Sequence, residues 1–124
     1  MIVVDASAVA AMLFGEPDGA TIAAHLEGEA LIAPQLIDYE LAHTCEKKIR
    51  RHSHQHEELI AMFTSLEQFG ISRISVPLAD VVSLALATGL TTYDASYLWL
   101  ATDRDIELVT LDRKLARVNA EMRD

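Results

Sequence analysis

The sequence is poor in cysteine and in long apolar runs, and each shortage excludes a class of protein. A single cysteine among 124 residues rules out an intrachain disulfide framework. No apolar stretch approaches the roughly 20 residues that a membrane-spanning helix needs. The opening residues, MIVVD, lack the basic segment and the long apolar core of a signal peptide. We therefore expect a cytoplasmic protein that does not enter a membrane.

Basic residues are also scarce. The chain has 10 Lys and Arg against 19 Asp and Glu, which gives a formal net charge of −9. Nonspecific binding to nucleic acid requires Lys and Arg to neutralise phosphates, so this balance argues against it. The basic residues nevertheless cluster within 47–51 and 113–123. An acidic protein with two such patches can hold RNA if cations mask its acidic centre, or it can bind a basic partner protein.

What the sequence does contain is typical of a globular domain. Hydrophobic residues make up 51% and charged residues 23%, a balance that distinguishes the chain from a disordered one. The length suits a single domain over residues 1–124 and leaves no room for two.

Short apolar runs alternate with segments of helical periodicity along the whole chain. We predict strands at 2–4, 30–33, 71–76 and 107–111, and helices at 7–14, 18–26, 35–51, 57–69, 77–89, 92–101 and from 112 onward. This alternation predicts an α/β fold, a mostly parallel sheet with helices on both faces. Ligands of such sheets bind beyond the carboxyl ends of the strands, and Asp5 and Asp112 directly follow the first and last strands.

A third carboxylate, Glu40, lies on an apolar helix face. At about 100° per residue it shares that face with Leu36, Ile37, Leu41 and Thr44. An inward-facing carboxylate is costly unless it is paired or binds a metal ion. The alternative is that Glu40 lies at the edge of the apolar stripe and extends to water.

A fourth carboxylate, Asp94, stands near the start of another predicted helix. Singly, Asp5, Asp94 and Asp112 are most simply helix caps or first-turn acids. If the fold brings them together with Glu40, however, the charges repel, because two unit charges ~5 Å apart cost about 3 kcal/mol at an effective dielectric constant near 20. Such a site must hold protons or divalent cations. Oxygen ligands alone select Mg²⁺ or Mn²⁺, ions that suit phosphodiester chemistry.

Four segments of the chain resemble the motifs of PIN domains and occur in the same order. They are IVVDASA (2–8), APQLIDYE (33–40), TTYDASYLWLA (91–101) and LVTLDRKL (108–115). The match runs nearly end to end and is closest to VapC-type toxins, the ribonuclease halves of toxin–antitoxin pairs. The resemblance implies a three-layer α/β/α fold with a mostly parallel sheet of four to five strands. The short tail after Asp112 indicates that a fifth edge strand is reduced or absent.

The resemblance also implies an activity, cofactors and partners. It implies an endoribonuclease dependent on Mg²⁺ or Mn²⁺, a cognate antitoxin that binds as a peptide over an apolar groove made by the early helices, and a homodimer. Carried over, the metal-binding catalytic residues are Asp5, Glu40, Asp94 and Asp112. Two hydroxyl residues, Ser7 and Thr110, match positions near that site and are candidate supports for it. Local roles, a helix cap for Ser7 and strand propensity for Thr110, are slightly favoured.

Three other functions stay open at this point. One is an RNA-processing PIN nuclease without an antitoxin. Another is a catalytically silent PIN-like binding module, which the loss of one acid would have favoured, although none is lost. The last is a phosphatase-like hydrolase with Asp5 and Thr110 at separate strand ends, which would leave Glu40 unexplained.

Two residue groups outside the acids have a functional and a structural interpretation. Three aromatic residues can stack on RNA bases or pack in the core or a dimer interface, and we favour packing because aromatics bury large areas: Tyr93, Tyr97 and Trp99. The basic run 47–51 is typical of a solvated helix end, and the alternative is a patch that follows a phosphate backbone.

Overall fold

A single parallel sheet organises residues 1–123, which are the residues that the computed structural model describes. Its strands are β1 (Ile2–Val4), β2 (Leu31–Pro34), β3 (Ser72–Ile74) and β4 (Glu107–Val109), in the order β3-β2-β1-β4. All three strand pairs are parallel, and Val3 lies between Ile32 and Leu108 in register. The first and last strands are therefore neighbours, with β4 at one edge of the sheet.

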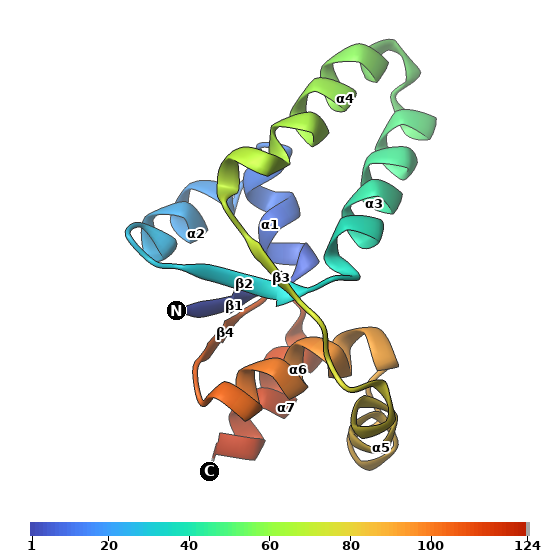
Figure 1. The fold of residues 1–124 in the computed structure, drawn as a ribbon. Helices are drawn as coiled ribbons and strands as arrows, with labels where there is room; N and C mark the ends of the chain where they lie inside the picture. Colours follow the sequence, from blue (N-terminus) through green and yellow to red (C-terminus); the bar gives the residue numbers. More distant parts are fainter. Residues whose placement is uncertain (124) are drawn as a thin grey trace.

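Helices cover both faces of this sheet. On one face lie α1 (Ala6–Leu13), α2 (Gly19–Leu26), α3 (Ile37–Arg51) and α4 (His56–Thr64), and on the other lie α5 (Leu78–Thr88), α6 (Thr92–Arg104) and α7 (Arg113–Arg123) (Figure 1). The predicted three-layer α/β fold with a parallel sheet is confirmed. The long hairpin of α3 and α4 extends away from the sheet, joined by a short 3₁₀ turn at Ser53–Gln55.

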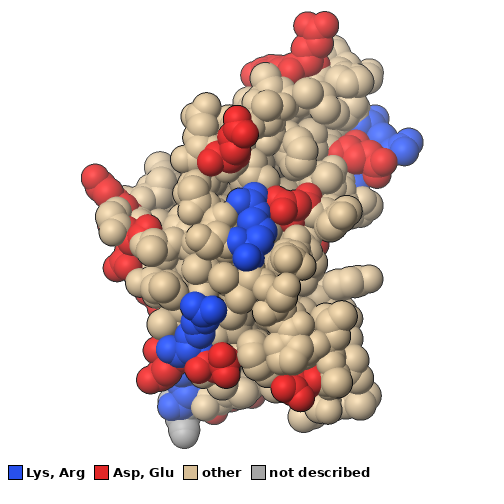
Figure 2. Space-filling view, viewed as in Figure 1, with Lys and Arg blue, Asp and Glu red and all other residues tan. Residues whose placement is uncertain are grey.

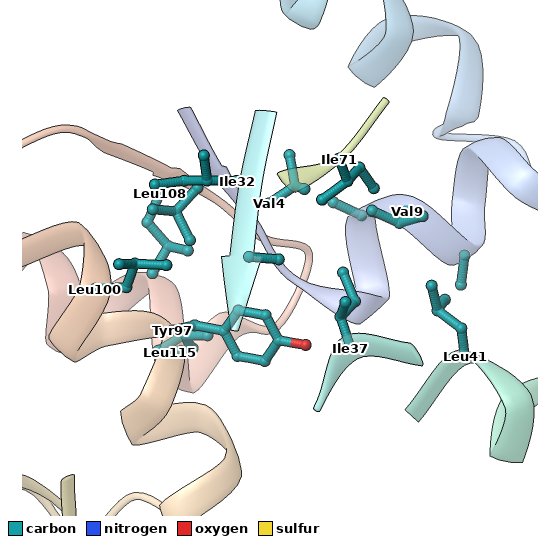
Figure 3. Close-up of a cluster of buried hydrophobic side chains, with 14 of the residues drawn as sticks. Val4, Val9, Ile32, Ile37, Leu41, Ile71, Tyr97, Leu100, Leu108 and Leu115 are labelled. Carbon is teal, nitrogen blue, oxygen red and sulfur yellow. The ribbon is translucent and has the colours of Figure 1, made fainter. Parts of the chain in front are cut away.

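The core lies on both sides of β1. Val3 and Val4 are completely buried, as expected for a strand covered by helices on both faces. Figure 3 shows side chains from α1 and α3 on one side of the sheet and side chains from α6 and α7 on the other. Gly19 allows α2 to start against α1, because an added Cβ would lie 2.4 Å from the backbone oxygen of Ala11. Because the sheet is parallel, α1, α3 and α7 start at the same side of it, beyond the carboxyl ends of β1, β2 and β4.

Several boundaries differ from the sequence expectation for local reasons. The helix predicted for 57–69 is α-helical only to Thr64 and continues as a 3₁₀ helix over Ser65–Phe69, which ends at Gly70 with a φ of 65°. Strand β3 is shorter than the predicted 71–76, whereas α6 runs past Ala101 to Arg104. Four strands make up the sheet of the described part of the chain, the lower number expected.

None of the helices within residues 1–123 combines the length and apolar character needed to cross a membrane.

Candidate active site

Asp5 is the most deeply buried of the four carboxylates, with 4% of its surface exposed. It follows β1 directly and caps α1, where its Oδ1 accepts hydrogen bonds from the backbone N–H of Ala8 at 3.0 Å and from Ser7 Oγ at 2.7 Å. Its Oδ2 accepts a hydrogen bond of 2.5 Å from Thr110 Oγ1. Capping and burial therefore fix the orientation of this carboxylate through three donors.

The hydroxyls of Ser7 and Thr110 connect Asp5 to the turn that follows β4. Ser7 Oγ accepts from the backbone N–H of Leu111 at 2.9 Å, and Thr110 Oγ1 accepts from that of Asp112 at 3.0 Å. The helix-cap interpretation of Ser7 is wrong, because α1 begins at Ala6 and Asp5 is its cap. Thr110 lies just beyond β4, so strand propensity does not explain it. Both side chains instead hold the first and last motifs together.

Glu40 projects from α3 toward the opposite layer of the fold. The hydroxyl of Tyr97, on α6, donates a hydrogen bond of 2.6 Å to Glu40 Oε1. Ile37 and Leu41, on the same face of α3, are fully buried. Glu40 itself is half-buried. The inward orientation predicted for Glu40 is thus found, and its carboxylate is paired with a phenol.

Asp94 and Asp112 both lie at helix starts, but only Asp112 caps its helix. Asp112 Oδ1 accepts from the backbone N–H of Leu115 at 2.8 Å, so this carboxylate caps α7. At α6 the cap is Thr91, whose Oγ1 accepts from the backbone N–H of Asp94 at 3.1 Å. Asp94 is therefore not the cap of α6. It is an acid in the first turn of that helix, which is the other local role expected of it.

The four carboxylates, called here the acidic site, lie close enough to influence one another. Burial raises the pKa of Asp5, and the charge of Asp112 raises it further. The hydrogen bonds from Thr110, Ser7 and Ala8 lower this pKa and offset part of the rise. Burial also raises the pKa of Glu40, and the charges of Asp94 and Asp5 add to this rise. The hydrogen bond from Tyr97 lowers the pKa of Glu40 and offsets part of the rise. The structure thus brings together acids from β1, α3, α6 and the start of α7.

Asp94 experiences the same repulsion with less compensation. Burial raises its pKa, the charges of Asp112 and Asp5 raise it further, and only Lys114 lowers it. The Lys114 ammonium is itself hydrogen-bonded to the backbone oxygen of Gly89 at 2.8 Å. Within residues 1–123, no Lys, Arg or His forms a salt bridge with any of the four acids. Negative charge therefore accumulates in the acidic site, and the distant charge of Lys114 offsets it only in part.

The donor set of the acidic site fits a hard divalent cation. All its ligand atoms are carboxylate oxygens, the kind that Mg²⁺ and Mn²⁺ prefer, and a bound cation would offset their repulsion. Across the described residues, however, no three acidic, imidazole or thiol side chains converge tightly enough to hold one ion. The acidic site is accordingly an open arrangement of carboxylates, of which Asp5 is the most firmly held.

Tyr97 is the residue of this site that sequence reasoning did not assign to it. It is 1% exposed, so the prediction of core packing is confirmed, but its hydroxyl also binds Glu40. Figure 3 shows the Tyr97 oxygen pointing toward the start of α3, near Ile37. Burial and the adjacent Glu40 raise the pKa of Tyr97, which keeps it protonated as a donor. The available signal was an inward Glu40 that needed a donor on the facing helix.

A cavity of about 420 Å³ adjoins the acidic site between α1 and α3, and we call it the α1–α3 cavity. Small side chains of α1 line one wall and polar side chains of α3 line the other; the lining residues are Ala6, Ser7, Ala10, Glu16, Glu40, His43, Thr44 and Lys47. Glu40 belongs to the acidic site and Ser7 donates a hydrogen bond to Asp5, so the cavity is continuous with the acidic site.

The fold and the acidic site agree with a known class of protein. The chain belongs to the PIN domain family, whose model matches residues 2–121. This match confirms the family predicted from the four motifs.

Individual relatives are similar over nearly the whole chain. Ribonuclease VapC3 of Pyrobaculum aerophilum is 36% identical, and the match covers 93% of this chain and 92% of that protein. Ribonuclease VapC12 of Mycobacterium tuberculosis is 27% identical over 94% of this chain and 91% of the relative. The crystal structure of PAE2754 from Pyrobaculum aerophilum superimposes with a TM-score of 0.73 at 29% identity, covering 92% of this chain and 82% of that one.

Proposed function

We propose that this protein is an endoribonuclease that hydrolyses RNA phosphodiester bonds with Mg²⁺ or Mn²⁺. The observation that carries the proposal is the acidic site, in which Asp5, Glu40, Asp94 and Asp112 repel one another and form no salt bridge with a basic side chain in the described residues. Membership of the PIN family and the ribonuclease names of two relatives support it. We further propose that it acts in the cytoplasm, on RNA.

In this proposal the four acids share the work of holding the cation and the attacking water. Asp5 and Asp112 are its central ligands, and Glu40 and Asp94 complete the site or orient the water. When bound, the cation neutralises phosphate charge, lowers the pKa of water and stabilises the leaving oxygen. Ser7 and Thr110 keep both Asp5 oxygens directed, and Tyr97 restrains Glu40. Such restraint matters because supporting hydrogen bonds tune ligand affinity.

Cleavage of a mixed RNA pool, with and without Mg²⁺ or Mn²⁺, tests the proposal. Asp94→Asn is the preferred inactivating variant, because the Asp94 side chain caps no helix. Asp5→Ala serves as a second variant, and Asp103→Asn, an exposed acid on the same helix, is the matched control. We expect metal-dependent cleavage by the wild type and the control, and at least a hundredfold loss in both site variants. Absence of cleavage by folded wild-type protein with metal would favour a binding module instead.

We also propose that the protein is the toxin of a toxin–antitoxin pair. The VapC names of two relatives support this, and so does an apolar surface suited to a peptide. A groove of about 400 Å³ between α3 and α4, the α3–α4 groove, is lined by Ala42, Cys45, Glu46, Ile49, Arg50, His56, Ile60 and Phe63. Co-expression with the product of a neighbouring small reading frame tests the pairing. A stable complex that suppresses cleavage is expected, and its absence would favour an RNA-processing nuclease.

A homodimer is the final part of the proposal. Leu78, Val82 and Leu86 recur every four residues along α5, and all three are exposed. They form an apolar stripe of the kind that helices bury against a partner. Sedimentation of the wild type and of Leu86→Lys tests this assignment. We expect a dimer that the substitution converts to a monomer without loss of helix content.

A further inference from the structure

The α1–α3 cavity leads from the acidic site along one side of α3. Four α3 residues line it, at positions that fall on one helix face: Glu40, His43, Thr44 and Lys47. Seven residues of helix separate the two ends of this row, a rise of roughly 10 Å. This distance is longer than a single phosphate group can span. A strand whose reacting phosphate lies at Glu40 would therefore present another phosphate near Lys47.

The charges in the cavity differ in whether they are already paired. Glu16 is bound by Lys48, with the ammonium nitrogen 2.9 Å from Glu16 Oε1. Glu40 accepts the bond from Tyr97 described above. Lys47 is the only lysine among the residues that line the cavity, and it forms no salt bridge with any residue in 1–123. Its ammonium is thus the positive charge that the cavity offers to an anion.

Half of the ten lysine and arginine side chains form salt bridges with acidic ones and so are less free to bind a phosphate backbone. On the face shown in Figure 2, basic side chains occur only in separate groups, each beside acidic ones. The net charge of −9 also makes distributed attraction of RNA weak. Local contacts next to the acidic site must then supply much of the affinity. Lys47, which forms no salt bridge among the described residues and lines the end of a cavity that begins at Glu40, can make such a contact.

We propose that Lys47 binds a backbone phosphate of single-stranded RNA that flanks the cleaved one, with the α1–α3 cavity as the path of the strand. This proposal rests on the proposed ribonuclease function. The small side chains of Ala6 and Ala10 leave the path open. Lys47 is a positioning residue, because it acts on a part of the substrate that does not react.

Binding of a labelled 12-nucleotide single-stranded RNA, measured by anisotropy in Mg²⁺ at several salt concentrations, tests the proposal. The Asp94→Asn background is used to prevent cleavage. Lys47→Ala should weaken binding roughly tenfold at low salt, as expected for loss of one charge-assisted contact. It should also reduce the slope of log affinity against log salt by about 0.7, the value for one phosphate of a single strand. Lys47→Arg should restore both.

Arg50→Ala is the matched control. It removes one positive charge from the same helix, but Arg50 lines the α3–α4 groove and contacts Glu46 at 3.5 Å. For Arg50→Ala, the slope of log affinity against log salt should equal that of the parent protein. Equal slopes for Lys47→Ala and the parent, or equal losses in both alanine variants, would overturn the proposal. Failure of the ribonuclease function is separate: it would appear as an intact chain that binds RNA through Lys47 but does not cleave it.

Discussion

The two sides of the acidic site differ in how firmly they are held. Asp5 is buried, and three donors fix both of its oxygens. Asp94, on α6, lies in the same electrostatic environment, yet Thr91 performs the capping and leaves the Asp94 carboxylate without a donor. One side of the site is therefore arranged by the protein alone. The other side is free to adjust when a cation or substrate binds.

The largest expected difference between these sides is in stability. Asp5→Ala removes the cap of α1 and leaves the Ser7 and Thr110 hydroxyls without their acceptor, so we expect the free energy of unfolding to fall by about 2 kcal/mol. Asp94→Asn removes charge repulsion, and it breaks no hydrogen bond because the Asp94 carboxylate makes none within residues 1–123. The free energy of unfolding should therefore change by less than about 0.5 kcal/mol or increase. Urea unfolding of both proteins without metal measures this. Equal losses would show that Asp94 is also structurally held.

A smaller effect is expected from the hydroxyl that joins the first and last motifs. Thr110→Val keeps the side-chain shape but removes the donor to Asp5 and the acceptor for the backbone of Asp112. We expect a loss of about 1–2 kcal/mol in stability and of roughly tenfold or more in cleavage. Thr102→Val, an exposed residue on α6, is the control and should change neither. Unchanged cleavage in Thr110→Val would argue that Asp112 keeps its position unaided.

Tyr97→Phe should have a milder effect again. It removes one hydrogen bond from Glu40 while the aromatic ring still fills the core, so a stability loss of about 1 kcal/mol is expected. Because that hydrogen bond lowers the pKa of Glu40, its loss should raise this pKa. The acid limb of the pH–cleavage profile should then move to higher pH. A lower rate with an unmoved profile would indicate that Tyr97 acts only through packing.

The smallest change is expected from pH, because hydrogen bonds offset part of the burial cost at Asp5 and Glu40. The pKa values of Asp5, Glu40 and Asp94 are raised in the folded protein. Their protonated forms thus stabilise the fold below the unfolded pKa, near 4, and this stability is lost as pH rises through the folded values.

Metal-free unfolding at pH 5 and pH 7 measures this contribution as the difference between the wild type and Asp94→Asn. The wild type should lose more stability than the variant as pH rises. Added Mg²⁺ at pH 7 should reverse that loss through binding to the folded state. A wild-type difference no larger than that of the variant would contradict the repulsion assigned to Asp94.

The sequence predicted the framework of the site better than its bonds. Asp5 and Asp112 could be placed because both follow strands directly, and Glu40 because its helix periodicity put it on the apolar face. Such signals depend on backbone geometry, which short-range patterns encode. That the four acids hold the metal and carry out the chemistry stays a prediction.

The parts that were missed depend on contacts between distant segments. The bond from Tyr97 to Glu40, which was not predicted, spans 57 residues. The bond from Thr110 to Asp5 spans 105 residues, and only the family resemblance indicated that Thr110 supports the site. No local pattern reports which buried tyrosine meets which acid. The cap of α6 was missed for another reason: Thr91 and Asp94 are both good capping residues, and only the backbone shows which one accepts the bond.

The pairing of β1 with β4 has a consequence for the newly made chain. During synthesis Asp5 leaves the ribosome early, but its partner Thr110 follows 105 residues later, and Asp112 later still. Contacts of such long range also form slowly in folding. An unfinished chain of this protein therefore holds only part of the acidic site. The acidic site is complete only after the residues up to Asp112 have been made and the first and last strands have paired.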